Sequence, residues 1–357
     1  MKTLLRLLLK SQHQQNRSRP AQTEKGMTLI ELLIGTVMAF LIITPMLSFV
    51  VDMLNTDRRE QVKSNTEQDI QAAVDFIAQD LSQAIYIYDN SADGVPALTT
   101  GNFIPTPANE TPILVFWKRQ QLKNSLPITA GAAPNTCTDS TPLTGTGACN
   151  DSYVLSLVAY YQVSGGDATW CQPSGGTCPT RIVRRQIQDG LKNPAQSANP
   201  DPVQRYFANG DLKNPDGQKR SPAFNIGTTT LPGFDISNPN ERVTIPTSVW
   251  DRVDVLVNYL DHTNPGPAGT QCTTALGNPT TQVGTGTQPI AENQLKIHNL
   301  NNTSFYACVD TQKNLARVTI RGNSLRRLQT DADYAASKSA FFPTATVQVQ
   351  GLGARGK

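Results

Sequence analysis

Apolar residues gather in one long run near the start of the sequence. Residues 27–51 contain 18 apolar residues, no Lys or Arg, and a single acidic residue, Glu31. A helix over this run would span about 37 Å at roughly 1.5 Å per residue, which is enough to cross a bilayer. The pattern therefore predicts a membrane-spanning helix over residues 27–54.

A helical period continues beyond this run. Apolar side chains recur every three or four residues, which places them on one face of a helix. We predict one helix from Thr28 to Tyr88, whose second half, residues 55–90, is amphipathic and continues into a globular head. Pro45 should bend or locally unwind it, because proline lacks the N–H and clashes with the preceding turn. The apolar side chains that recur on this helix face, called the helical stripe below, are Ile70, Val74, Ile77, Leu81, Ile85 and Tyr88.

Beyond about residue 100 the pattern changes to short runs typical of β-strands. Val253, Val255 and Val257 fall on alternate positions, as do Val347 and Val349. This period of two indicates an antiparallel sheet with one buried face. The predicted strands cover residues 113–118, 153–163, 181–188, 252–260, 304–310, 315–321 and 344–350.

Segments rich in Gly, Pro, Thr and Asn separate these runs. Loops of their length are uncommon unless they are functional, disordered or pinned by cross-links. A hairpin turn is predicted at residues 312–314. We expect an α+β fold: the long N-terminal helix packs on an antiparallel β-sheet head over residues 91–350, and residues 351–357 form a flexible tail. The long loops lie at about 120–150, 190–245 and 262–295.

Basic residues concentrate ahead of the apolar run. Residues 1–26 hold six Lys and Arg residues and one acid, Glu24, whereas the rest of the chain has 25 basic and 27 acidic residues. Basic residues stay on the cytoplasmic side of a membrane span, which would place the C-terminal bulk outside the cytoplasm. Because that bulk is weakly acidic, we expect no nucleic-acid partner.

All six cysteines follow the apolar run. An even number in an oxidising compartment favours disulfides that pin the loops. The alternative is a zinc site, but no C-x-x-C spacing occurs and only His262 and His298 follow the run, so we expect no metal. Fifteen pairings are possible, of which proximity along the chain suggests Cys137–Cys149, Cys171–Cys178 and Cys272–Cys308.

A plain single-pass anchor or a secretory signal peptide would also explain an apolar run. The run is too long for a signal peptide, begins only at residue 27, and lacks a small-x-small cleavage site after it. Glu31 does not suit a plain anchor, because a charge at membrane depth costs roughly 2.5–3.5 kcal/mol. Cleavage after Gly26 would create a free α-amino group. Opposite charges about 4 Å apart gain roughly 4 kcal/mol at an effective dielectric near 20, which offsets the cost.

The junction between leader and helix carries a specific motif. It reads Lys25-Gly26-Met27-Thr28-Leu29-Ile30-Glu31 and resembles the class III signal of type IV prepilins and type II secretion pseudopilins. The resemblance implies that a prepilin peptidase removes the leader 1–26 after Gly26 and methylates the new N-terminus at Met27, where the family most often has Phe. It also implies that Glu31 is the assembly glutamate, which neutralises the N-terminus of a neighbouring subunit in the filament core.

The region after the apolar run indicates which members of this family the chain resembles. Residues 57–84 are similar to the corresponding helix of minor pilins of the PilW type and pseudopilins of the GspJ type. Residues 27–90 look most like the pseudopilins of hormogonium polysaccharide secretion in filamentous cyanobacteria. The resemblance implies a type IV pilus-like or type II secretion-like machine for polysaccharide secretion and gliding motility. The implied partners are other pilins, the inner-membrane assembly platform and polysaccharide.

Signals for other functions are weak. No G-x-S-x-G motif or cofactor fingerprint in a usable context occurs, so we expect no enzyme and no cofactor. Arg184-Arg185 and Arg326-Arg327 look like solvated charges, and the aspartates of one loop are not at calcium-loop spacing. An adhesin or ligand-binding module displayed on a pilus is the alternative, and a membrane-anchored enzyme is a weaker one. The loop aspartates that are not at calcium-loop spacing are Asp201, Asp211 and Asp216.

Overall fold

The computed structural model describes most of the chain after the leader. The described residues are 28–101, 104–138, 147–201, 203–214, 252–330 and 332–353. Gly26, Met27 and Asp216 therefore lie outside the described residues, together with residues 354–357. The chain divides into two compact units, one ending at Arg58 and the other beginning at Arg59.

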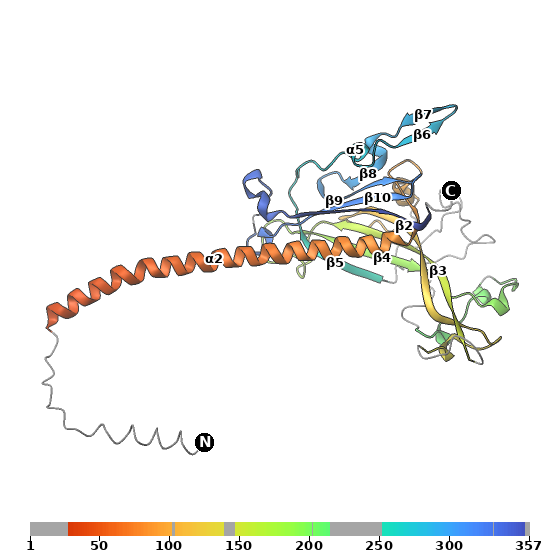
Figure 1. The fold of residues 1–357 in the computed structure, drawn as a ribbon, viewed down its shortest axis with the longest axis horizontal. Helices are drawn as coiled ribbons and strands as arrows, with labels where there is room; N and C mark the ends of the chain where they lie inside the picture. Colours follow the sequence, from red (N-terminus) through yellow and green to blue (C-terminus); the bar gives the residue numbers. More distant parts are fainter. Residues whose placement is uncertain are drawn as a thin grey trace, which may run out of the picture. The chain divides into compact units, whose positions relative to one another are not determined.

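Helix α2 runs from Leu29 to Ser82 over 54 residues (Figure 1). Pro45 lies inside it, and the helical conformation continues on both sides, so the predicted local unwinding is not found. Proline removes one backbone hydrogen bond, and the neighbouring turns keep theirs. Thr44 adds a bond here, since its Oγ1 donates to the carbonyl oxygen of Phe40 at 2.8 Å.

The predicted C-terminal end of this helix at Tyr88 is wrong. The helix ends at Ser82, and Ala84–Ile87 form strand β1. After Ser82 the chain pairs with strand β2 (Glu110–Pro127). The pairing begins where Arg119 donates its backbone N–H to the carbonyl of Gln83 at 3.2 Å. Isoleucine and tyrosine in this stretch suit a strand as well as a helix, so spacing alone could not place the boundary.

Two larger antiparallel sheets form the body of the head, where the sequence pattern predicts one. The first has the strand order β1-β2-β3-β4-β5, and the second has the order β11-β10-β9-β8. Alternation of apolar residues reports which face of a strand is buried, but not which sheet the strand joins. The further strands are β3 (Cys149–Val163), β4 (Thr180–Gln188), β5 (Arg252–Leu260), β8 (Lys296–Asn299), β9 (Asn302–Asp310), β10 (Leu315–Arg321) and β11 (Thr344–Gln350).

The predicted loop at 262–295 is not structureless. It contains the short helices α5 (Cys272–Ala275) and α6 (Glu292–Leu295), and between them a two-stranded sheet of β6 (Thr280–Val283) and β7 (Gly286–Pro289). A further short helix, α3 (Val95–Thr100), follows β1. The described 3₁₀ turns are Pro134–Thr136, Pro194–Gln196, Val203–Arg205, Asn209–Asp211, Leu325–Arg327 and Ala336–Phe341.

The predicted hairpin between β9 and β10 is confirmed. The carboxylate of Asp310 accepts the backbone N–H groups of Gln312 at 3.1 Å and Lys313 at 3.3 Å. Asn314 completes the turn with a φ of 47°, a left-handed conformation that asparagine tolerates. Its side chain also donates to the carbonyl of Ala84 at 3.0 Å, which ties the turn to β1.

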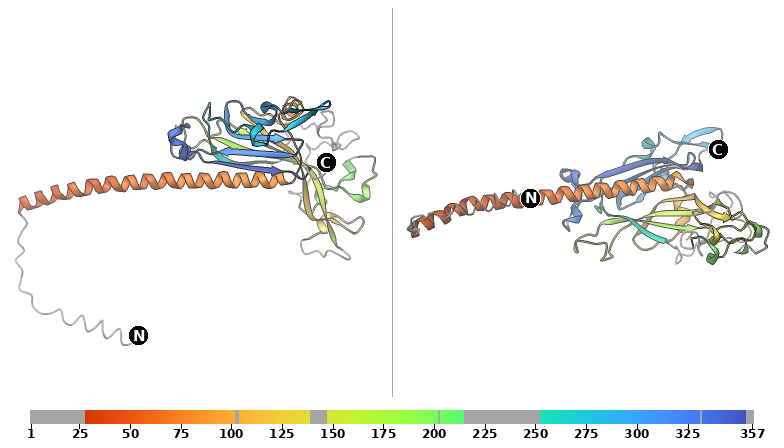
Figure 2. Two further views of the ribbon diagram at one scale, coloured as in Figure 1. Left: turned by 45° about the horizontal axis from the view of Figure 1, so that its top comes forward. Right: turned by 60° about the horizontal axis from the view of Figure 1, so that its bottom comes forward.

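The core of the head lies between the two sheets and the C-terminal part of α2. Ile70, Val74, Ile77 and Leu81 of α2 are each at most 2% exposed. In the right-hand view of Figure 2, this part of α2 runs between the blue strands and the yellow-to-green strands. Close packing is visible at Gly322, where an added Cβ would come within 2.7 Å of Thr66 on α2.

Three disulfides pin the connections of the head. They join Cys137 to Cys149, Cys171 to Cys178, and Cys272 to Cys308, which are the pairs that proximity along the chain suggests. The start of the predicted tail also packs on the head. An added Cβ on Gly351 would lie 2.3 Å from the carbonyl oxygen of Ala84, so only glycine fits there.

Candidate functional site

The first unit presents an apolar surface with one charge at its start. Eighteen large apolar side chains between Leu29 and Leu54 are each at least 48% exposed. Water-soluble monomers rarely leave contiguous apolar surface of this extent uncovered, so it marks a membrane or a protein contact. Among the described residues, this helix is the one segment long and apolar enough to cross a membrane.

Glu31 lies in the first turn of α2 and is exposed. Thr28 Oγ1 donates a hydrogen bond to Glu31 Oε2 at 3.4 Å, in the spacing of a capping pair. A carboxylate at this end also complements the partial positive charge of the helix N-terminus. Gly26 and Met27, the other two predicted site residues, lie outside the described residues, so the geometry of the cleavage site is not part of this structure.

Polar side chains inside the apolar run bond to their own helix. Thr36 Oγ1 donates to the carbonyl oxygen of Leu32 at 3.0 Å, and Thr44 does the same to Phe40. These hydroxyls therefore need no outside partner when the helix enters an apolar environment. Glu31 is the only ionisable side chain between Leu29 and Val51, so it carries the single charge of this apolar stretch.

A buried ionic cluster connects α2 to the first sheet within the head. Asp80 Oδ1 lies 2.7 Å from Lys118 Nζ on β2, and Asp80 Oδ2 lies 2.6 Å from Arg184 Nε on β4. Tyr160 of β3 donates its hydroxyl to the same carboxylate at 2.7 Å. The side chains of all three charged residues are at most 8% exposed. The cluster joins one helix to three neighbouring strands.

The environment of Asp80 sets its protonation. Burial raises the pKa of this carboxyl group, but Arg184 and Lys118 together lower it by more, so its pKa lies below the usual value. Burial and, to a smaller extent, the nearby Arg184 together lower the pKa of Lys118 by more than Asp80 raises it, so this pKa lies below its usual value. Burial and the nearby Asp80 raise the pKa of Tyr160 well above its usual value. Asp80 is therefore ionised at neutral pH, and Tyr160 is protonated.

The prediction that the two arginine pairs are solvated charges is wrong. Besides Arg184, Arg185 is an ion-pair partner, with its Nη2 2.7 Å from Glu110 Oε2. Arg326 is completely buried and donates to the carbonyl oxygens of three residues in the 171–178 disulfide loop. Arg327 forms an ion pair with Asp69 of α2. Nothing in a single sequence distinguishes such arginines from solvated ones, because their partners lie more than 70 residues away.

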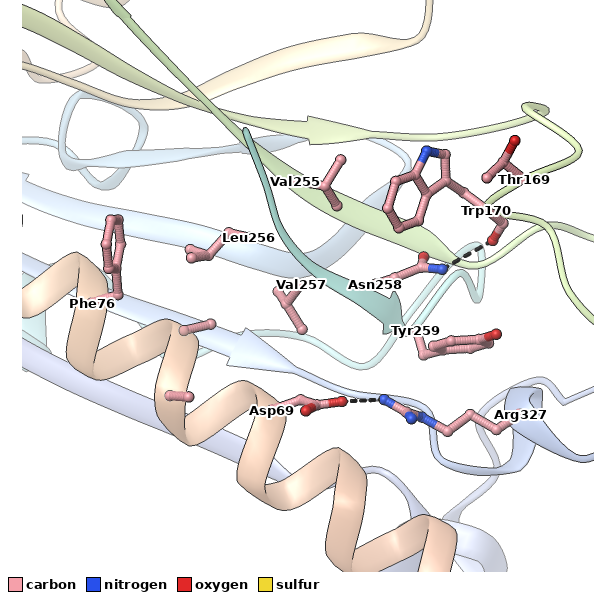
Figure 3. A pocket seen from close by; sticks show the side chains of 12 residues that line it. Asp69, Phe76, Thr169, Trp170, Val255, Leu256, Val257, Asn258, Tyr259 and Arg327 are labelled. Atoms are coloured by element: carbon pink, nitrogen blue, oxygen red, sulfur yellow. Dashed lines mark hydrogen bonds and ion pairs between the residues drawn. The ribbon is translucent and has the colours of Figure 1, made fainter. Parts of the chain in front are cut away.

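A groove beside β5 was not anticipated from the sequence. It has a volume of about 630 Å³ and lies between α2 and β5, which is the edge strand of the first sheet (Figure 3). Phe76 of α2, Tyr259 of β5 and Trp170 of the loop after β3 contribute aromatic side chains. They come from three distant segments, and no motif links them. No group of three or more His, Cys, Asp or Glu in the described part of the chain could hold a metal ion.

Comparison of the chain with protein-family models, with curated proteins and with solved structures finds no match in any of the three. Three features of the chain bear on its function: the leader motif, the apolar surface of α2 and the geometry of the head.

Proposed function

We propose that the chain is a minor pseudopilin, a non-catalytic subunit of a type IV pilus-like or type II secretion-like machine that secretes polysaccharide and supports gliding motility. The observation that carries this proposal is the exposed apolar part of α2, in which Glu31 is the only ionisable residue up to Val51. An uncovered surface of this kind needs either lipid or similar helices around it. The motif at Gly26 favours similar helices as the surroundings of this surface after cleavage.

The proposed sequence of events is mechanical. The leader holds the precursor in the inner membrane, with its N-terminus in the cytoplasm and the head outside. A prepilin peptidase cleaves between Gly26 and Met27, and the new α-amino group becomes available to Glu31 of a neighbouring subunit. Subunits then pack through the apolar helix into a periplasmic or cell-surface filament, supported by the inner-membrane assembly platform.

The three disulfides of the head support this orientation. Disulfides form and persist in oxidising compartments such as the periplasm, and rarely in the cytosol. All six cysteines that form them follow the apolar helix in the sequence. The basic leader supports the same topology, because positively charged flanks stay in the cytoplasm.

Glu31→Ala tests the role of the charge in assembly. The variant should be cleaved normally but recovered in sheared filaments at less than about a tenth of the wild-type level, because a charge pair worth more than 1.4 kcal/mol is lost. Glu60→Ala, which removes an exposed acid from the same helix beyond the apolar run, should assemble normally. Filament incorporation of Glu31→Ala at the wild-type level would contradict the proposed pairing.

A second candidate function is a pilus-displayed adhesin or ligand-binding minor pilin. The groove beside β5 favours it, because aromatic side chains from three segments converge there.

A further inference from the structure

Two aromatic side chains of the groove beside β5 are restrained by contacts with arginines. The guanidinium carbon of Arg327 lies 4.5 Å from the centre of the Tyr259 ring, and Arg327 is itself fixed by its ion pair with Asp69. The guanidinium carbon of Arg184 lies 5.7 Å from the centre of the Phe76 ring. Such cation–π contacts restrict the rings before any ligand arrives, which lowers the entropic cost of binding.

The third aromatic side chain is positioned through its backbone. Asn258 of β5 donates its side-chain amide to the carbonyl of Trp170 at 3.0 Å (Figure 3). The disulfide between Cys171 and Cys178 closes the loop that follows Trp170, and the buried Arg326 holds the carbonyls inside that loop. The neighbours Arg326 and Arg327 thus each support one aromatic residue of the groove.

Tyr259 adopts a conformation that its side chain does not favour. Its φ is 60°, in the left-handed region where a bulky residue is an outlier. Residues in such regions persist where the surrounding structure requires them. Here the neighbouring backbone holds the residue, since Asn323 donates to the Tyr259 carbonyl at 2.8 Å. The strained backbone turns the phenol ring toward Arg327 and the groove.

The positive and negative charges of the groove lining cancel each other. Among the residues that the structure describes, Asp69 and Arg327 are the only charged ones that line it, and they form an ion pair with each other. The lining therefore carries no net charge to attract a phosphate, a nucleic acid or an acidic polymer. The remaining polar side chains are those of Thr169, Tyr259 and Asn258. The two hydroxyls suit hydrogen bonds with neutral groups, whereas the Asn258 amide already donates to the Trp170 carbonyl.

We infer that this groove binds a neutral glycan chain. Sugar rings present flat C–H faces that pack on Trp, Tyr and Phe rings, while their hydroxyls project sideways to meet polar groups at the rim. The volume of about 630 Å³ lies within the usual range of ligand sites, roughly 300–1,000 Å³, and is small for the footprint of a folded protein. This inference deepens the second candidate function, because it names the ligand class of the same groove, and it does not depend on the proposed assembly role.

Binding should be measured with the full-length protein in nanodiscs, which avoid detergents that have sugar headgroups. The probes are cellohexaose, dextran and soluble starch as neutral glycans, and alginate as an anionic one. Titration calorimetry follows the oligosaccharide, and retardation in native gels that contain each polymer follows the others. At least one neutral glycan should bind, and alginate should not. Binding of none of the three neutral glycans, or of alginate alone, overturns the inference.

Three variants locate the binding site. Phe76 is 44% exposed, so Phe76→Ala should fold normally and weaken binding about fivefold or more through the loss of one aromatic contact. Trp170→Ala should act in the same direction. Tyr153→Ala is the matched control, because Tyr153 is 50% exposed and stacks with Arg119 at 3.8 Å but lies outside the groove. Equal affinity of the Phe76 and Trp170 variants and the wild type would place the glycan elsewhere.

A photo-crosslinker in place of Phe76 distinguishes a glycan from a protein strand added to the edge of β5. The inference predicts that the bound glycan protects this position from cross-linking. Capture of a second polypeptide copy that an excess of glycan does not reduce would contradict the inference.

Discussion

Asp80 of α2 and Arg184 of β4 form a buried ion pair, with 2.6 Å between Oδ2 and Nε, although 104 residues separate them in the chain. The same carboxylate meets Lys118 and Tyr160. One side chain of the helix thus satisfies groups from β2, β3 and β4. The cluster fixes where the helix sits on the first sheet, because few other positions of Asp80 could reach all three partners.

Removal of this carboxylate should destabilise the head strongly. Asp80→Ala leaves the charges of Arg184 and Lys118 buried with no acid between them, and such losses cost about 3–5 kcal/mol. Asp75→Ala, at an exposed position five residues earlier on the same helix, should change the free energy of unfolding by less than about 0.5 kcal/mol. Denaturant unfolding followed by circular dichroism measures both. A cost below about 1 kcal/mol for Asp80→Ala would mean that the cluster contributes little.

The low pKa of Asp80 predicts a dependence of stability on acid. A carboxyl group whose folded pKa is depressed contributes stability above its unfolded pKa of about 4, and this contribution is lost as the pH falls through the folded pKa. The unfolding free energy of the wild type should therefore fall more steeply below about pH 4 than that of Asp80→Asn. Parallel pH profiles for the two proteins would show that Asp80 is not the group responsible.

The disulfides should differ in their contribution to stability. Cys272 and Cys308 are 36 residues apart, whereas Cys171 and Cys178 are 7 residues apart. A longer closed loop removes more entropy from the unfolded chain, so replacing the first pair by alanine should cost about 4 kcal/mol and the second about 2 kcal/mol. Unfolding midpoints of the two double variants measure the order. A larger cost for the 171–178 pair would contradict the loop-length argument.

Local patterns in the sequence predicted much of the fold. The period of two placed β5, β10 and β11 at their observed bounds, because Val or Ile recurs at every second position within each of them. The spacing of three and four residues along the helical stripe likewise identified Ile70 and Leu81 as core residues. The boundary between α2 and β1 was missed, because Ile85 and Tyr88 continue a helical spacing although the chain has already paired with β2.

Contacts between residues that are far apart in the chain could not be predicted from a single sequence. Arg184 and Arg326 look like solvated charges when their neighbours in the chain are considered, but each becomes a buried donor once distant segments fold around it. The groove beside β5 was missed for the same reason, because Phe76, Trp170 and Tyr259 share no spacing or motif. The assembly residues show the opposite case. Gly26, Met27 and Glu31 form a contiguous motif, so the sequence alone yields that hypothesis.

Removal of the leader is the step on which the proposed assembly depends most. Mass spectrometry of the N-terminal peptide, from protein expressed with a prepilin peptidase and isolated from membranes, tests this directly. The account predicts that the chain begins at a methylated Met27, and that Gly26→Ala leaves an uncut precursor. A native chain that still begins at Met1, or normal cleavage of the Gly26 variant, would contradict it and leave a head tethered to the membrane by a plain anchor.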